Sequence, residues 1–142
     1  EECMRLISQF ESLTGAGSRD CIVDNRNERI IFVINPGDMG LAIGKGGSSI
    51  KKASDVMGKR IEVVEYAPDP AQFLRNCFLP AQVTGIEFST NEEDLQVALV
   101  EVRDEDRGLA IGKGGKNIFK AKVLAQRQHD IADVQLAQNE VA

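Results

Sequence analysis

One eight-residue segment occurs twice in this chain, and it constrains the fold more than any other feature of the sequence. Gly40-Leu-Ala-Ile-Gly-Lys-Gly-Gly47 recurs residue for residue at Gly108–Gly115, 68 positions later in a chain of 142 residues. The correspondence continues downstream, where Ile50 matches Ile118 at the same offset. Two copies are too few for a solenoid, which needs three or more repeats. The repeat therefore predicts a duplicated domain.

The pattern around the first copy predicts six elements. Apolar residues at helical spacing indicate a first helix, and the continuously apolar segment 30–34 is typical of a strand covered on both faces or central in its sheet. Asp38 follows a Pro-Gly break and is expected to be the N-cap of a short helix. The predicted order is a helix over 2–14, strands over 20–25 and 29–35, a short helix to Ile43, a helix over about 48–57 and a strand over 61–65.

The second copy repeats this order. The predicted elements are a helix around 73–78, strands over 82–88 and 95–103, a short helix that starts at Asp104–Asp106, a helix over about 116–128 and a strand over 131–136. The acidic run before the second loop is expected to cap a helix N-terminus. The segments join at Tyr66-Ala-Pro-Asp-Pro70, which is short and proline-rich and should hold the two halves close. We therefore expect an α+β protein of two domains, 1–66 and 67–142.

Charge is distributed unevenly along the chain. The net charge is −5. However, the segment 44–60 carries a local net charge of +4, the segment 112–129 carries +5, and the remainder carries −14. Both basic segments begin at the repeated glycine motif. A solvated helix face would explain lysines alone, but their association with the motif favours an anionic ligand at two sites.

The glycine motif itself has the chemistry of a phosphate site. Glycine allows backbone angles closed to other residues and lets another backbone approach closely. The helix that is expected to follow directs its free N–H groups and its positive dipole end at the loop. Lys45 and Lys113 add a mobile positive charge to each loop. A turn that only joins two helices needs one glycine, whereas each loop has three in four positions.

Enzymatic uses of these glycines fit poorly. A Walker A loop is one residue longer and needs Ser or Thr where Gly46 stands, and the dinucleotide fingerprint fails because Ser49 occupies its third glycine position. His129, beside Asp130, is expected at an exposed helix end with no nucleophile nearby. Cys3 and Cys77 are expected on apolar helix faces and Cys21 in a strand, without metal-ligand spacing. We expect no enzymatic activity, no cofactor and no metal.

The segments Ala42-Ile-Gly-Lys-Gly-Gly-Ser-Ser-Ile50 and Ala110-Ile-Gly-Lys-Gly-Gly-Lys-Asn-Ile118 resemble the I-G-x-x-G-x-x-I signature of KH domains. The predicted element order resembles the type II form of that fold, which implies a three-stranded sheet with helices packed on one face. Two such domains in tandem resemble the NusA family of transcription factors, in particular its short archaeal form. The resemblance covers nearly the whole chain.

This resemblance implies which residues meet RNA. Lys45 and Gly46, with Lys113 and Gly114, would contact the backbone of a single strand, of which one KH domain typically clamps about four nucleotides. Isoleucines beside the loops would form part of the apolar floor for the bases, although they could equally belong to the core. The implied RNA-binding residues are Ile43, Gly44, Lys45, Gly46, Gly47, Ile50, Lys51, Ile111, Gly112, Lys113, Gly114, Gly115, Lys116 and Ile118.

The expected function is single-stranded RNA binding in transcription termination or antitermination, with RNA polymerase or a nascent transcript complex as a candidate partner. A ribosome-associated or rRNA-processing KH protein is the alternative within binding. An enzyme acting on nucleotides and a protein scaffold with one inactive KH domain are the alternatives from other classes. No signal peptide or membrane span is visible in the sequence, which predicts a cytoplasmic protein without membrane contact.

Overall fold

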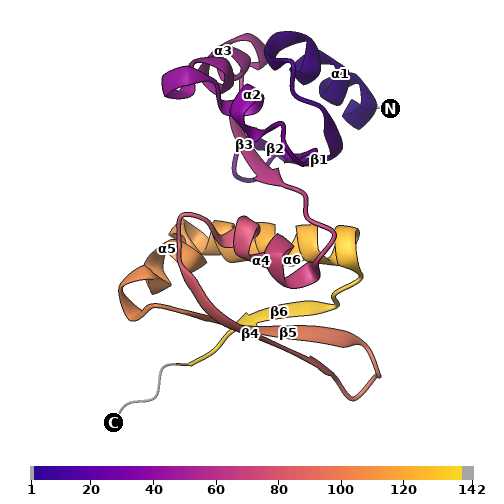
Figure 1. The fold of residues 1–142 in the computed structure, drawn as a ribbon, viewed down its shortest axis with the longest axis vertical. Coiled ribbons are helices and arrows are strands. Elements are labelled where there is room, and N and C mark those ends of the chain that lie inside the picture. Colours follow the sequence, from indigo (N-terminus) through magenta and orange to yellow (C-terminus); the bar gives the residue numbers. More distant parts are fainter. Residues whose placement is uncertain (1, 139–142) are drawn as a thin grey trace. The chain divides into compact units, whose positions relative to one another are not determined.

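The computed structural model describes residues 2–138 of the chain (Figure 1). The chain divides into two compact units, Glu1–Ala67 and Pro68–Ala142. Each unit contains one three-stranded sheet, in which neighbouring strands follow the order of the sequence. No helix within residues 2–138 is long and apolar enough to cross a membrane. The expected α+β class, with two tandem units of the same element order, is confirmed.

The first unit begins with the predicted helix and pairs its strands around β2. β1 is antiparallel to β2, and β3 is parallel to it, so β2 is the central strand and is buried along its whole length. The elements are α1 (Glu2–Thr14), β1 (Ser18–Asp24), β2 (Arg29–Ile34), α2 (Met39–Ile43), a single 3-10 turn (Lys45–Gly47), α3 (Ser48–Met57) and β3 (Arg60–Glu65).

The second unit repeats this plan with a longer hairpin and a longer last helix. β4 is antiparallel to β5, and β6 is parallel to β5. The elements are α4 (Pro70–Phe78), β4 (Val83–Thr90), β5 (Gln96–Val102), a 3-10 turn (Asp104–Asp106), α5 (Arg107–Ile111), a second 3-10 turn (Lys113–Gly115), α6 (Lys116–His129) and β6 (Asp133–Leu136). The second unit in Figure 1 shows α4 and α6 side by side over one face of its sheet.

The core of each unit lies between its helices and one face of its sheet. In the first unit the ring of Phe10 on α1 stacks on Phe32 of β2 with centroids 4.3 Å apart, and both side chains are fully buried. In the second unit α4 buries Phe73, Leu74 and Cys77 together with its last residue, Phe78. Phe32 is thus a core residue, in agreement with the continuously apolar segment 30–34. Cys3, Cys21 and Cys77 are free cysteines on the predicted elements.

Two expectations about residues in the second unit were wrong. His129 is not simply an exposed helix end, because it is partly buried and its ring lies 5.3 Å from that of Phe73. The last strand begins at Asp133, not at Ile131. Ile131 is fully buried in the turn after α6, where its N–H donates to the carbonyl of Ala125 at 3.3 Å. Its apolar side chain therefore signalled burial and not strand pairing.

Candidate nucleic-acid interface

The two glycine loops have the same backbone conformation, although they belong to different units of the chain. Gly44 has φ 76° and ψ 169°, and Gly112 has φ 78° and ψ 165°. Gly46 has φ 64° and ψ 20°, and Gly114 has φ 64° and ψ 19°. All four lie at positive φ, which side chains other than glycine adopt at a cost. The repeated sequence therefore encodes one loop geometry twice.

The first and third positions of each loop use glycine for different reasons. A Cβ on Gly44 would lie 2.7 Å from the backbone nitrogen of Ser49, and a Cβ on Gly112 would lie 2.8 Å from that of Asn117. These glycines are needed to close the loop onto the helix that follows. A Cβ on Gly46 or Gly114 would meet nothing within 4 Å. The inner glycine therefore leaves an open approach to the loop backbone.

The helix after each loop begins without a capping side chain. The N-caps of α3 and α6 are Gly47 and Gly115, and neither helix has a side-chain hydrogen bond at its cap. The 3-10 turn before each helix already accepts the first helical N–H, because Ser48 donates to the carbonyl of Lys45 and Lys116 to that of Lys113. The helix dipole places partial positive charge at the same end. Each loop thus ends at a helix terminus suited to an anionic oxygen.

Lysines surround this terminus in both units. Lys45 and Lys113 are exposed at the second position of each loop, and Lys51 is exposed on α3. Lys116, the first residue of α6, is partly buried. The four predicted cations therefore lie in or directly after the loops, as the repeat indicated.

The predicted apolar residues divide into two groups. Ile43 and Ile111 precede the loops and are 39% and 36% exposed, so they lie at the surface. Ile50 and Ile118 follow the loops and are partly buried, and Ile50 packs against the core of the first unit. Only the first pair presents much apolar surface beside the loop. Ile50 of the second pair joins its helix to the core of the first unit.

Sequence reasoning missed a second exposed apolar pair. Leu41 on α2 and Leu109 on α5 are each 51% exposed, whereas the alanine that follows each of them is fully buried. In each short helix the larger apolar side chain is exposed and the smaller one is buried, although burial of the larger one would remove more apolar surface from water. The repeated octapeptide contained this signal, because it includes both leucines.

The short helix before each loop is tied to the chain segment that leads into the first strand of its unit. The expected N-cap hydrogen bond from Asp38 is absent. Instead, the Asp38 carboxylate accepts from the N–H of Gly17 at 2.9 Å. Asp106 likewise makes no cap bond and accepts from the N–H of Gln82 at 2.9 Å. These two aspartates therefore fix the start of the loop helix against a neighbouring segment, which their position in sequence could not show.

Comparison with known proteins follows the same division into two units. A family model for the KH domain matches residues 6–79, and one for the NusA-like second KH domain matches residues 70–139. The "Probable transcription termination protein NusA" of Halobacterium salinarum is 42% identical over 136 residues, which are 96% of this chain and 95% of that protein.

The chain belongs to the NusA family. A NusA protein of Methanococcus vannielii is 40% identical over 96% of this chain and 76% of its own length. The transcription termination/antitermination protein NusA of Thermus thermophilus is 34% identical over 91 residues, 23% of its length. The crystal structure of the protein APE1850 matches with a TM-score of 0.84 and 37% identity, covering 96% of this chain and 98% of that one.

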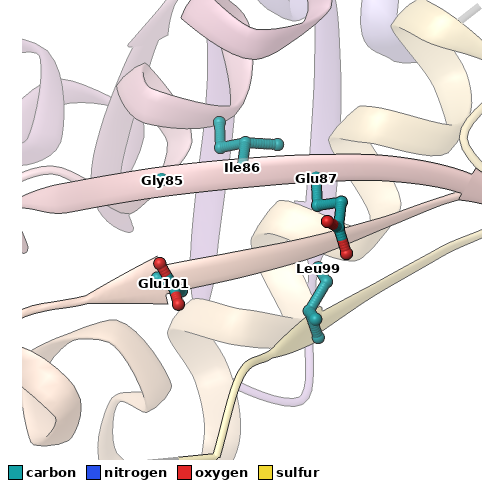
Figure 2. A pocket seen from close by; sticks show the side chains of 5 residues that line it. All are labelled: Gly85, Ile86, Glu87, Leu99 and Glu101. Atoms are coloured by element: carbon teal, nitrogen blue, oxygen red, sulfur yellow. The ribbon is translucent and has the colours of Figure 1, made fainter.

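The sheet of the second unit carries a cavity whose charge is opposite to that of the glycine loops. A shallow cavity of about 240 Å³ lies along β4 and β5 and is lined by Gly85, Ile86, Glu87, Leu99 and Glu101. Figure 2 shows the side chains of Glu87 and Leu99 on one side of these strands and Ile86 on the other. Carboxylates at this cavity repel phosphate, which distinguishes it from the basic loops.

Two thiols of this NusA-family chain, those of Cys21 and Cys77, are buried. Burial raises the pKa of the Cys77 thiol to about 12, and burial together with the neighbouring Cys3 raises that of Cys21 to about 12. Both thiols are therefore protonated at neutral pH and are poor nucleophiles. Within residues 2–138, no three His, Cys, Asp or Glu side chains form a group that could hold a metal ion.

Proposed function

We propose that this NusA-family chain binds single-stranded RNA through both glycine loops and acts as a transcription termination or antitermination factor. The observation that carries the proposal is the pair of loops with one backbone conformation, each with an exposed lysine and an uncapped helix terminus. The relatives named as transcription termination proteins support the biological setting. The nascent transcript and its RNA polymerase complex are the partners that this setting implies.

Three features of each loop favour the binding of a phosphodiester. The strand approaches over Gly46 or Gly114, where no side chain blocks the backbone. The positive end of the helix dipole then attracts phosphate oxygens, and the adjacent lysine neutralises the remaining charge. The same arrangement in each unit supports two RNA-binding domains, 1–66 and 67–142, that each hold about four nucleotides.

Bases would lie on the apolar surface beside each loop. Ile43 and Leu41 supply it in the first unit, and Ile111 and Leu109 supply it in the second. Apolar contacts of this kind favour unstacked bases, which only single-stranded RNA presents. Nothing in this mechanism requires a bond to be made or broken. The proposal is accordingly a binding module and not an enzyme.

The test places acidic pairs in the loops. We expect K45D/G46D and K113D/G114D each to lower the affinity for a single-stranded oligonucleotide by about tenfold or more, because two carboxylates would face the phosphates. Both variants should fold, since a Cβ at Gly46 or Gly114 meets no neighbour and Asp is tolerated at this positive φ. Binding is measured by fluorescence anisotropy, and folding by circular dichroism and thermal unfolding.

The chain offers a matched control in the first unit. Gly58 and Lys59 lie at the opposite end of α3, and Gly58 has φ 73° with no atom within 4 Å of a built Cβ. G58D/K59D therefore makes the same change of charge and backbone type away from the loop. We expect it to bind RNA within about threefold of the parent. Equal losses in the loop and control variants would show that only net charge matters and would refute the proposed sites.

A further inference from the structure

Phe119 is the most exposed phenylalanine of the chain. Its side chain on α6 is 50% exposed. The other five phenylalanines are buried or partly buried: Phe10, Phe32, Phe73, Phe78 and Phe88. A large aromatic ring left in water forgoes the free energy of burial that the other rings gain. Its position in the molecule therefore calls for an explanation.

The ring lies close to the second glycine loop. Phe119 is the fourth residue of α6, and the N-cap of that helix is the loop residue Gly115. At 1.5 Å per residue, about 6 Å of helix axis separate the two. The buried residues of α6 include Lys120, Ala121 and Leu124, which places Phe119 on the opposite, solvent-facing side. Half of the ring surface is thus displayed to solvent beside the loop.

The duplicated unit carries a different residue at this place. Lys51 stands at the corresponding position of α3 and is also exposed. Exposed apolar residues therefore flank the second loop on both sides, with Leu109 and Ile111 before it and Phe119 after it. The first loop has such residues on α2, before the loop, and has a cation at the place of Phe119. The exposed Val56 lies near the far end of α3, away from the loop.

The charges around Phe119 favour a polyanion over an apolar protein surface. Lys116 and Lys122 lie three residues before and after it on α6, and a helix places residues at this spacing next to one another. Lys122 also forms a half-exposed ion pair with Asp133 at 3.6 Å, so Lys116 and the loop residue Lys113 contribute most of the positive charge near the ring. The segment 112–129 contains no acidic residue. A ring between two lysines matches a nucleic acid, which offers a flat base beside phosphates.

We infer that Phe119 stacks on an RNA base at the point where the strand leaves the second loop. The inference rests on the proposed function and deepens it. The second unit gains a contact with a base that salt does not screen, whereas the first unit uses Lys51 at the same place to meet a phosphate. The two loops, although alike in backbone, then differ in one added contact: the second unit adds a stacked base and the first adds a phosphate.

The absence of tryptophan from the chain makes a direct test possible. F119W introduces a single indole at the proposed stacking position. Stacking on a base quenches indole fluorescence, so RNA should quench this variant strongly. L95W is the matched control, because Leu95 is 47% exposed in the same unit but lies in the turn between β4 and β5. We expect RNA to leave its fluorescence unchanged.

Affinity measurements complete the test. Loss of one base–aromatic stack should weaken binding of F119A by on the order of tenfold, and the loss should persist in high salt. F119K copies the first unit and should steepen the log–log dependence of affinity on salt by about 0.7, the value for one additional phosphate contact on a single strand.

Two failures can be told apart. If the parent binds RNA and K113D/G114D abolishes the second site, while F119A binds as the parent does, the stacking inference is overturned and the proposed function stands. Equal quenching of F119W and L95W would overturn it in the same way. If the parent itself does not bind single-stranded RNA, the proposed function fails and the inference fails with it.

Discussion

At the scale of single residues, the first and third glycines of each loop have separable duties. Gly44 adopts φ 76° and ψ 169°, a region in which essentially only glycine is found, and it also lies against the backbone of Ser49. Gly46 has a left-handed conformation with open space around it. Gly44 therefore determines whether the loop forms, and Gly46 determines whether an RNA backbone can approach it closely.

This distinction predicts different costs for the same substitution. G44A should lower the free energy of unfolding by about 2–3 kcal/mol, because strain and a clash with Ser49 add together. G46A should lower it by only about 1 kcal/mol, the cost of a left-handed alanine. Urea unfolding followed by circular dichroism measures both. Equal destabilisation by the two variants would show that crowding at Gly44 has no energetic importance.

Residue roles were predictable from sequence only where the role follows from residue type. The loop glycines and their lysines follow from the repeat, and the structure places them at helix termini as expected. The partner of Asp38 was not predictable. Asp38 occupies a capping position, but its carboxylate accepts a hydrogen bond from the N–H of Gly17, which is distant in sequence. Competition between a local and a tertiary hydrogen-bond donor is decided by packing, which the sequence pattern does not display.

At the scale of elements, a buried ion network joins the three strands of the first unit. Arg29 of β2 is 1% exposed and donates to Asp24 of β1 at 2.8 Å and to Glu62 of β3 at 3.1 Å. Although desolvation raises the pKa of Asp24, hydrogen bonds from Asn27 and Arg29 outweigh it, so the pKa lies below its usual value. The ionised carboxylate is therefore favoured in the folded state.

The direction of this shift gives a pH dependence. A carboxyl group whose pKa is lowered by folding stabilises the protein above its unfolded pKa of about 3.9, and that stabilisation is lost as the pH falls through the lower folded pKa. D24N should cost about 3 kcal/mol at pH 7, because it breaks a buried pair. The difference between parent and variant should shrink as the pH falls below about 4.

Urea unfolding at pH 7 and at pH 3 checks this prediction. D55N is a suitable control, because Asp55 is an exposed acid on α3 of the same unit. It should change stability little at either pH. A loss in D24N that is the same at both pH values would mean that the charge of Asp24 does not contribute to folding.

The order of the elements could be predicted because apolar spacing changes between strands and helices, and the repeat supplied each assignment twice. Boundaries were less accessible. β1 begins at Ser18, two residues before the expected start, and its register shifts between Ser18 and Asp20. A polar strand end joined through an irregular pairing carries no alternating pattern. The ion network of Arg29 was likewise invisible, since Glu62 lies 33 residues from Arg29 in the sequence.

At the scale of the whole molecule, very little chain separates the two units. The N–H of Tyr66 donates to the carbonyl of Ile34 in the first unit at 2.8 Å. Asp69 already caps α4 of the second unit by accepting from the N–H of Gln72 at 3.2 Å. Only Ala67 and Pro68 lie between these two attachments. Because this covalent connection is so short, we expect the two units to bind one RNA strand jointly.

Joint binding predicts a dependence on RNA length. Two sites of about four nucleotides each need eight or more, and a second contact on the same strand benefits from a high effective concentration. Affinity should therefore rise steeply between a four-mer and a twelve-mer. The salt dependence should rise as well, by about 0.7 in log–log slope for each additional phosphate neutralised.

Titration of oligonucleotides of increasing length at two salt concentrations measures both quantities. In the parent, a twelve-mer should bind more tightly and with a steeper salt slope than a four-mer. In K113D/G114D, this advantage should largely disappear, because one site remains. A parent that shows the same affinity and slope for both lengths would bind through a single loop or through two loops acting separately.

The same exposed lysine occupies the second position of both loops. Folding makes no demand on the side chain at Lys45 or Lys113, because both project into solvent from a backbone that the glycines determine. Exposed positions need not be the same in two repeated units, and positions 51 and 119 are lysine in one unit and phenylalanine in the other. The two loops nevertheless have identical sequences, lysine included, which is what we expect if both units bind the same ligand chemistry.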